Sequence, residues 1–87
     1  MIEIGKILSI IYYKKMDNED FLKLGYKIKY LRNKKGFSQL DLSLKTGLTT
    51  RTISRIECGT IDPKYSTLVR ISEALDSKLI DLLNFSL

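Results

Sequence analysis

The 87 residues are enough for one small domain and too few for two. A single cysteine and the absence of histidine exclude an internal disulfide framework and a zinc site of the usual Cys/His kind, and the sequence predicts no metal or other cofactor. The formal net charge of +5 is concentrated between residues 21 and 59, where lysine and arginine far outnumber acidic residues. A clustered positive field favours a polyanionic partner.

Residues 1–16 form an apolar extension that favours self-association. Their β-branched content slightly favours a strand, and a helix is the open alternative. The strand pattern uses the alternation Ile2, Ile4, Leu8, Ile10 and Tyr12. The helical pattern places Ile4, Ile7, Leu8 and Ile11 on one face. Because a single strand leaves its backbone groups unpaired, a matching strand from a second copy would complete it. We therefore predict a self-association arm; the alternative is a leader that precedes a start at Met16.

The same extension bears on localisation. It is too short to span a bilayer, and Glu3 and Lys6 interrupt it early. No basic segment precedes the apolar stretch, and no small-residue cleavage site follows it, so it does not match a signal peptide. We expect a cytoplasmic protein without a membrane partner.

Residues 17–87 are predicted to form an all-α domain of five short helices. The first helix begins at residues 17–20, where Asp and Asn side chains cap free N–H groups and acids suit the positive end of the helix dipole. Its apolar stripe comprises Phe21, Leu24, Ile28 and Leu31. It ends at Lys34-Lys35-Gly36, with cations and a glycine suited to a left-handed conformation. We expect Tyr26 and Tyr30, four residues apart, to be partly buried against neighbouring helices.

Two brief helices follow, separated by a tight turn at Gly47. Ser38 opens one of them, with Asp41 three residues later in a capping-box arrangement. Thr49 caps the other, whose inner face carries Ile53 and Ile56. Neither helix is long enough to be stable alone. Such a pair is typical of proteins that present one helix to a partner at a fixed angle.

The last two helices follow a loop that contains Pro63. One has the apolar stripe Leu68, Ile71 and Leu75, and the other carries Leu79, Leu82 and Leu83. Several of these elements recur in one known pattern. Its residues here are Leu24-Gly25, Ile28, Leu31-Arg32, Gly36-Phe37-Ser38-Gln39, Leu42-Ser43, Gly47-Leu48-Thr49, Ile53 to Gly59, Pro63, Leu68, Ile71, Ala74-Leu75 and Leu82. From Leu24 to Leu83 the chain resembles the Cro/C1 (XRE) family of helix-turn-helix regulators, which implies a lambda repressor-like fold.

The resemblance implies that the helix of residues 50–57 enters the major groove of double-stranded DNA. The residues expected to contact bases are Thr50, Arg51, Ser54 and Arg55. Arginine can bond guanine through two atoms, and a threonine methyl can contact thymine. The residues expected to contact phosphates are Gln39, Thr49, Thr52 and Lys45. The resemblance also implies a structural ion pair between Arg32 and Glu57. Leu40 and Leu44 depart from the family pattern, which usually has polar residues there, and offer an unusual apolar surface.

The function that follows is sequence-specific DNA binding by a homodimer on an inverted-repeat operator. The protein would be a transcriptional regulator of one of three kinds: a phage-type repressor, a restriction–modification controller or a stand-alone regulator. The alternative is an antitoxin-like protein that binds a partner protein and autoregulates its own promoter. With no histidine, no paired carboxylates in one motif and no glycine-rich phosphate loop, we expect no enzyme and no catalytic residues. The sequence shows no sensor domain, so no small-molecule effector is evident.

Overall fold

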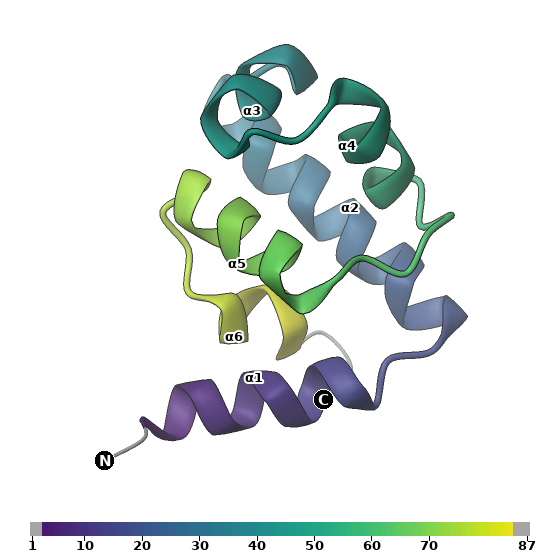
Figure 1. The fold of residues 1–87 in the computed structure, drawn as a ribbon, viewed down its shortest axis with the longest axis vertical. Coiled ribbons are helices and arrows are strands. Elements are labelled where there is room, and N and C mark those ends of the chain that lie inside the picture. Colours follow the sequence, from purple (N-terminus) through teal and green to yellow (C-terminus); the bar gives the residue numbers. More distant parts are fainter. Residues whose placement is uncertain (1–2, 85–87) are drawn as a thin grey trace.

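The computed structural model describes residues 3–84, and these residues form six α-helices (Figure 1). The helices are α1 (Ile4–Lys14), α2 (Asn18–Lys34), α3 (Gln39–Thr46), α4 (Thr50–Glu57), α5 (Tyr65–Ala74) and α6 (Leu79–Leu83). No strand occurs in this part of the chain. The predicted all-α class is therefore confirmed, and the five expected helices are α2 to α6. Ile2 and residues 85–87, to which some expectations referred, lie outside the described residues.

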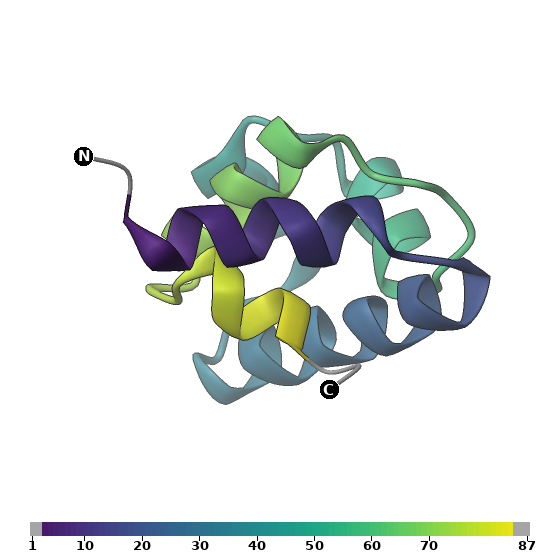
Figure 2. The ribbon, with the colours of Figure 1, turned by 90° about the horizontal axis from the view of Figure 1, so that it is seen from below.

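The N-terminal extension is a helix, so the slight preference for a strand was wrong. A strand needs a neighbouring strand for its backbone groups, whereas α1 satisfies most of them within itself. Its inner face carries the buried Ser9 and the half-buried Tyr12 and Tyr13, whereas Ile4, Ile7, Leu8 and Ile11, which the helical alternative placed on one face, are exposed. Figure 2 shows α1 lying across α6, which it contacts closely.

Hydroxyl groups and aromatic rings attach α1 to the start of α5. The Ser9 and Tyr65 hydroxyls are hydrogen-bonded at 3.0 Å, and the Tyr13 hydroxyl donates to the Pro63 carbonyl at 3.1 Å. The Tyr13 and Tyr65 rings pack edge to face with their centroids 5.3 Å apart. Aromatic pairs in this geometry contribute beyond the area that they bury. These contacts explain why the tyrosine side of α1 faces inward.

The core is formed by side chains from all of the helices from α2 to α6. Its buried members are Leu24, Ile28, Leu42, Ile53, Ile56, Leu68, Ile71, Leu75, Leu82 and Leu83. These residues make up most of the apolar stripes expected from helical periodicity, whereas Phe21, Leu31 and Leu79 of those stripes are half-buried. Tyr26 and Tyr30 are exposed rather than partly buried, because each follows a buried residue of α2 by two positions and so lies on the opposite side of the helix.

The turns around α3 have the predicted cap chemistry. Gly36 and Gly47 have φ angles of +75° and +77°, a left-handed conformation that strains any residue with a Cβ. The Ser38 side chain accepts the Asp41 backbone N–H at 2.9 Å, and the Asp41 carboxylate accepts the Ser38 N–H at 2.8 Å. This reciprocal pair sets where α3 begins and therefore the direction in which it runs.

The capping box at Ser38 should make the stability of the domain sensitive to acid. Hydrogen bonds from the backbone and side chain of Ser38 hold the pKa of Asp41 below its usual value. Because this pKa is lower in the folded than in the unfolded chain, the stabilisation is complete above about pH 4. It is lost as the pH falls through the lowered pKa. In urea titrations from pH 7 to pH 2, Asp41→Asn should differ most from wild type at neutral pH, and the two should converge in acid. A difference that stays constant over this range would contradict the prediction.

Candidate DNA-binding surface

Helix α4 has one buried and one exposed face. Ile53 and Ile56 lie in the core, whereas Thr50, Arg51 and Arg55 are exposed. Ser54, which sequence reasoning placed outward with them, is half-buried at the edge of this face. The inner isoleucines determine how α4 is rotated about its axis, so two arginines four residues apart project on the same outer side.

The N-terminus of α4 is capped by Thr49, whose hydroxyl also bonds that of Thr52. The Thr49 hydroxyl accepts the backbone N–H of Thr52 at 3.1 Å, and the two hydroxyls are hydrogen-bonded at 3.0 Å. Thr49 is exposed and Thr52 is half-buried. The first turn of α4, which carries Thr50 and Arg51, is therefore held by a side-chain cap.

The turn between α3 and α4 is tied down by small polar side chains. The Ser43 hydroxyl donates to the Leu48 carbonyl. The buried Thr46 hydroxyl donates to the Leu42 carbonyl at 2.7 Å and accepts the Leu48 N–H at 3.2 Å. These hydrogen bonds of Ser43 and Thr46 hold the angle between the two helices.

Arg32 and Glu57 lie together, joining the end of α2 to the end of α4. Two hydrogen bonds link them, from Nε to Oε2 at 2.6 Å and from Nη2 to Oε1 at 2.9 Å. The side chains are only 8% and 3% exposed. The hydrogen bond with Glu57 raises the pKa of Arg32. Arg32 also donates through Nη1 to the Phe37 carbonyl at 2.8 Å, so the pair holds the loop before α3 as well.

Gln39 joins this network, which the sequence did not indicate. Its amide nitrogen donates to Glu57 Oε1 at 3.1 Å, and the side chain is half-buried at the start of α3. A primary amide has two N–H groups, so one remains for a further partner. The network thus orients the amide of Gln39, the predicted phosphate contact, at the start of α3.

Gly25 allows α2 and α4 to approach closely. A Cβ atom built on Gly25 would lie 2.4 Å from the Ile56 carbonyl oxygen and 2.5 Å from that of Glu57. Real Cβ atoms essentially never approach other atoms so closely. The backbone of α4 therefore rests directly against α2, and no side chain separates the two helices at this point.

The exposed arginines of α4 have no carboxylate partner in the part of the chain that the structure describes. The ion pairs found there join Lys23 to Glu19, Arg32 to Glu57 and Lys35 to Asp76. Arg51 and Arg55 thus present their charge to solvent. Lys45 is exposed at the end of α3, with its Nζ 4.7 Å from the centroid of the Phe37 ring.

Other kinds of site are poorly represented among residues 3–84. The free thiol of Cys58 is exposed directly after α4. No group of three His, Cys, Asp or Glu side chains in this range is arranged to hold a metal ion. None of the helices within it combines the length and the apolar character that crossing a membrane requires.

A family model described as Helix-turn-helix matches residues 28–82, which is more than half of the chain. The chain therefore belongs to the helix-turn-helix family, and the resemblance to Cro/C1 regulators is confirmed. The fold is similar to that of the restriction-modification controller protein C.AhdI from Aeromonas hydrophila, with a TM-score of 0.72 and 28% sequence identity. That similarity covers 74% of this chain and 97% of the controller protein.

The chain is also similar in sequence to a curated relative, the uncharacterized HTH-type transcriptional regulator y4dL of Sinorhizobium fredii (strain NBRC 101917 / NGR234). It is 41% identical over 49 residues, which are 56% of this chain and 25% of the relative. This chain therefore aligns with about a quarter of that protein. Helix α1 lies outside the residues that match the family model.

Proposed function

We propose that this protein binds double-stranded DNA sequence-specifically as a homodimer and regulates transcription in the cytoplasm. The observation that carries the proposal is α4, whose exposed arginines are held on a helix that is capped at Thr49 and anchored by the buried Glu57. Helix-turn-helix proteins place the N-terminal part of this second helix against base edges in the major groove. The name of the controller protein C.AhdI supports a restriction–modification controller over the other two kinds of regulator.

Base recognition is assigned to the outer side of α4. Arg51 and Arg55 are long enough to bond guanine O6 and N7 through two atoms, and Thr50 lies beside Arg51 in the first turn. Ser54 completes the group from its half-buried position, with its hydroxyl able to donate or accept. These four residues are the proposed base contacts.

Phosphate contacts are assigned to residues around the ends of α3 and α4. The second N–H of Gln39 and the free N–H groups of the first turn of α3 suit a phosphate oxygen. Thr49 and Thr52 lie at the corresponding end of α4, and Lys45 adds a cation near the turn. Such contacts place the protein on the duplex and carry no sequence information.

A two-fold symmetric pair of chains reads a two-fold symmetric sequence. Two copies of α4 would enter successive major grooves about 34 Å apart, which corresponds to one turn of DNA. The operator is therefore expected to be an inverted repeat whose half-sites are centred about ten base pairs apart.

Alanine at Arg51 or Arg55 should weaken and broaden DNA recognition. The wild-type protein first selects its preferred duplex from random-sequence DNA. Each variant is then titrated with this duplex and with single-base variants at constant salt concentration. Each substitution should raise the dissociation constant about 5-fold to 150-fold and relax preference at one base pair in each half-site. Gln39→Ala should instead weaken binding to all duplexes alike.

Lys78→Ala provides the matched control, because it removes one exposed positive charge at the start of α6 rather than on α4. It should leave base preference unchanged. If Arg51→Ala and Arg55→Ala both retain wild-type affinity and base preference, α4 is not the reading helix and the proposed function fails.

A further inference from the structure

Exposed apolar side chains are concentrated on α1. Half of the large hydrophobic residues that are exposed in the described chain lie in the first eight residues of α1. Their exposed fractions range from 36% to 74%, and they are Ile4, Ile7, Leu8, Ile10 and Ile11. Single exposed hydrophobic residues are normal on protein surfaces, whereas a contiguous group marks an interaction surface. We refer to Ile4, Ile7, Leu8 and Ile11, which share one side of the helix, as the α1 stripe.

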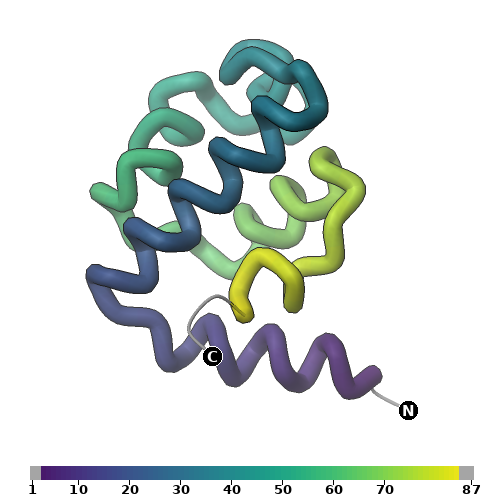
Figure 3. The backbone as a smooth tube through the Cα atoms, turned by 180° about the vertical axis from the view of Figure 1, so that it is seen from behind, coloured from purple at the N-terminus to yellow at the C-terminus, as the bar shows by residue number. Residues whose placement is uncertain are grey.

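The α1 stripe faces away from the rest of the molecule. The opposite side of α1 is already occupied, because Ser9, Tyr12 and Tyr13 pack toward α5 and α6. Figures 1 and 3 both show α1 at the end of the molecule opposite α3 and α4. The α1 stripe is therefore separate from the proposed DNA-reading surface.

Charge on α1 changes sign along its length. Glu3 immediately precedes the helix, and Lys14 and Lys15 stand at its end, all three of them exposed. Lys6 in the first turn is exposed too, but helical periodicity places it on the other side of α1 from the α1 stripe. If two copies of α1 packed in parallel, the lysines of both copies would come together. Antiparallel packing instead brings Glu3 of each copy to the lysines at the end of the other helix.

We propose that the α1 stripe packs antiparallel against the α1 stripe of a second copy of this chain. A two-fold axis between Ile7 and Leu8 places Ile4 opposite the partner's Ile11. At 1.5 Å per residue, Glu3 then lies about 3 Å along the axis from the partner's Lys14, within reach of a lysine side chain. Opposite charges thus select both the partner and its direction. The inference rests on the proposed self-association of the chain and assigns it a surface; because α1 lies at the end of the molecule opposite α4, this contact does not itself set the one-turn spacing of two α4 helices. Residues 1–16 thus act as a self-association arm built from a helix.

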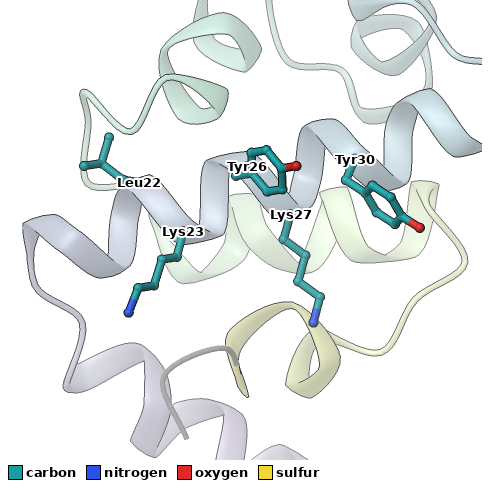
Figure 4. Close-up of a pocket in the computed structure, with 5 residues that line it drawn as sticks. All are labelled: Leu22, Lys23, Tyr26, Lys27 and Tyr30. Atoms are coloured by element: carbon teal, nitrogen blue, oxygen red, sulfur yellow. The ribbon is translucent and has the colours of Figure 1, made fainter.

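A second exposed apolar stripe is less suited to self-association. It runs along α2, where Leu22, Tyr26 and Tyr30 line a shallow hollow together with Lys23 and Lys27 (Figure 4). A two-fold axis through the middle of this stripe would bring lysines of the two copies together. Like charges at a contact oppose association, so the α2 stripe serves as the comparison surface in the test.

Analytical ultracentrifugation of the full chain tests the assignment. Ile7→Glu should raise the dimer dissociation constant at least about 100-fold, because it places two like charges beside each other at the two-fold axis. Tyr26→Glu is the matched control, since it introduces the same charge on an exposed residue of the α2 stripe, and it should leave the dimer unchanged. Circular dichroism checks that both variants are folded.

Charge reversal tests the antiparallel direction. Glu3→Lys and Lys14→Glu should each weaken the dimer, and the double variant should restore it, which a purely local effect on helix stability would not do. A monomeric wild-type protein, a dimeric Ile7→Glu variant, dissociation by Tyr26→Glu or absence of rescue would each overturn the proposal.

DNA titration separates this inference from the proposed function. An Ile7→Glu monomer that still prefers the selected half-site over a scrambled duplex would support both. A different result would be that Ile7→Glu dissociates the dimer while the wild-type protein shows no preference for any duplex. The α1 interface would then stand, and the proposed function would fail.

Discussion

Replacing Gly25 with alanine should destabilise the domain by about 3 kcal/mol, at the upper end of the range for overpacked interiors. The new methyl group would meet the carbonyl oxygens of Ile56 and Glu57 at 2.4 and 2.5 Å. Both are backbone atoms and cannot rotate away as the end of a side chain can. The methyl group is accommodated only if α2 and α4 move apart, which also loosens the contacts of Ile53 and Ile56 in the core.

Gly5→Ala is the matched control for this substitution. Gly5 is also helical, but nothing lies within 4 Å of a Cβ built there. Because alanine has the higher helix propensity, this variant should be more stable than wild type by about 0.5 kcal/mol. Urea denaturation of the three proteins gives the free energies of unfolding. A Gly25→Ala variant with the wild-type midpoint would show that α2 and α4 are not in direct backbone contact.

Removing the carboxylate of Glu57 should cost about 3–5 kcal/mol of folding free energy. Glu57→Ala leaves the guanidinium of Arg32 almost fully buried without its partner, and it also removes the acceptor of Gln39. A buried charge without a counter-charge is among the few causes of such large single-residue effects. The midpoint of urea or thermal unfolding measures the loss.

The exposed pair of Lys35 and Asp76 is the control. The distance from Lys35 Nζ to Asp76 Oδ2, 2.9 Å, is similar to the distances in the Arg32–Glu57 pair, but the Asp76 side chain is 82% exposed. Asp76→Asn should leave the unfolding midpoint nearly unchanged, because water screens this pair and asparagine tolerates the positive φ angle at that position. Replacing both Arg32 and Glu57 with leucine should recover part of the stability lost in Glu57→Ala. Equal effects of Glu57→Ala and Asp76→Asn would show that burial of the Arg32–Glu57 pair is energetically unimportant.

These variants also separate stability from DNA recognition. Gly25 and Glu57 fix the position of α4 on its buried side, against α2, whereas Arg51 and Arg55 lie on its outer side. We expect Gly25→Ala and Glu57→Ala to lower the free energy of unfolding. They should affect DNA binding only as far as α4 is displaced. The arginine substitutions should change binding and leave the unfolding midpoint within about 0.5 kcal/mol of wild type, as is usual at exposed positions.

The sequence by itself determined the helices of the helix-turn-helix region, because their signals are local. Ser38 and Thr49 mark helix starts through side-chain caps a few residues away, and Gly47 marks a left-handed turn. The apolar stripes then determine which side of each helix is buried. The exposed position of Arg51 and Arg55 followed from Ile53 and Ile56 through periodicity alone. The pairing of Arg32 with Glu57 was expected only from the resemblance to a known family.

Only the tertiary structure decided the conformation of α1 and its orientation. Its apolar residues fit a strand and a helix almost equally, since both patterns bury one side of the segment. Because no strand lies beside this segment in the described residues, its backbone groups are satisfied within a helix. Distant partners, namely the hydroxyl of Tyr65 and the carbonyl of Pro63, then hold the tyrosine side of α1 inward. The contact of Gly25 with α4 and the bond from Gln39 to Glu57 are likewise made between residues far apart in the chain. Local patterns describe neighbours within a few residues, so they carry no information about which surfaces meet once the helices pack.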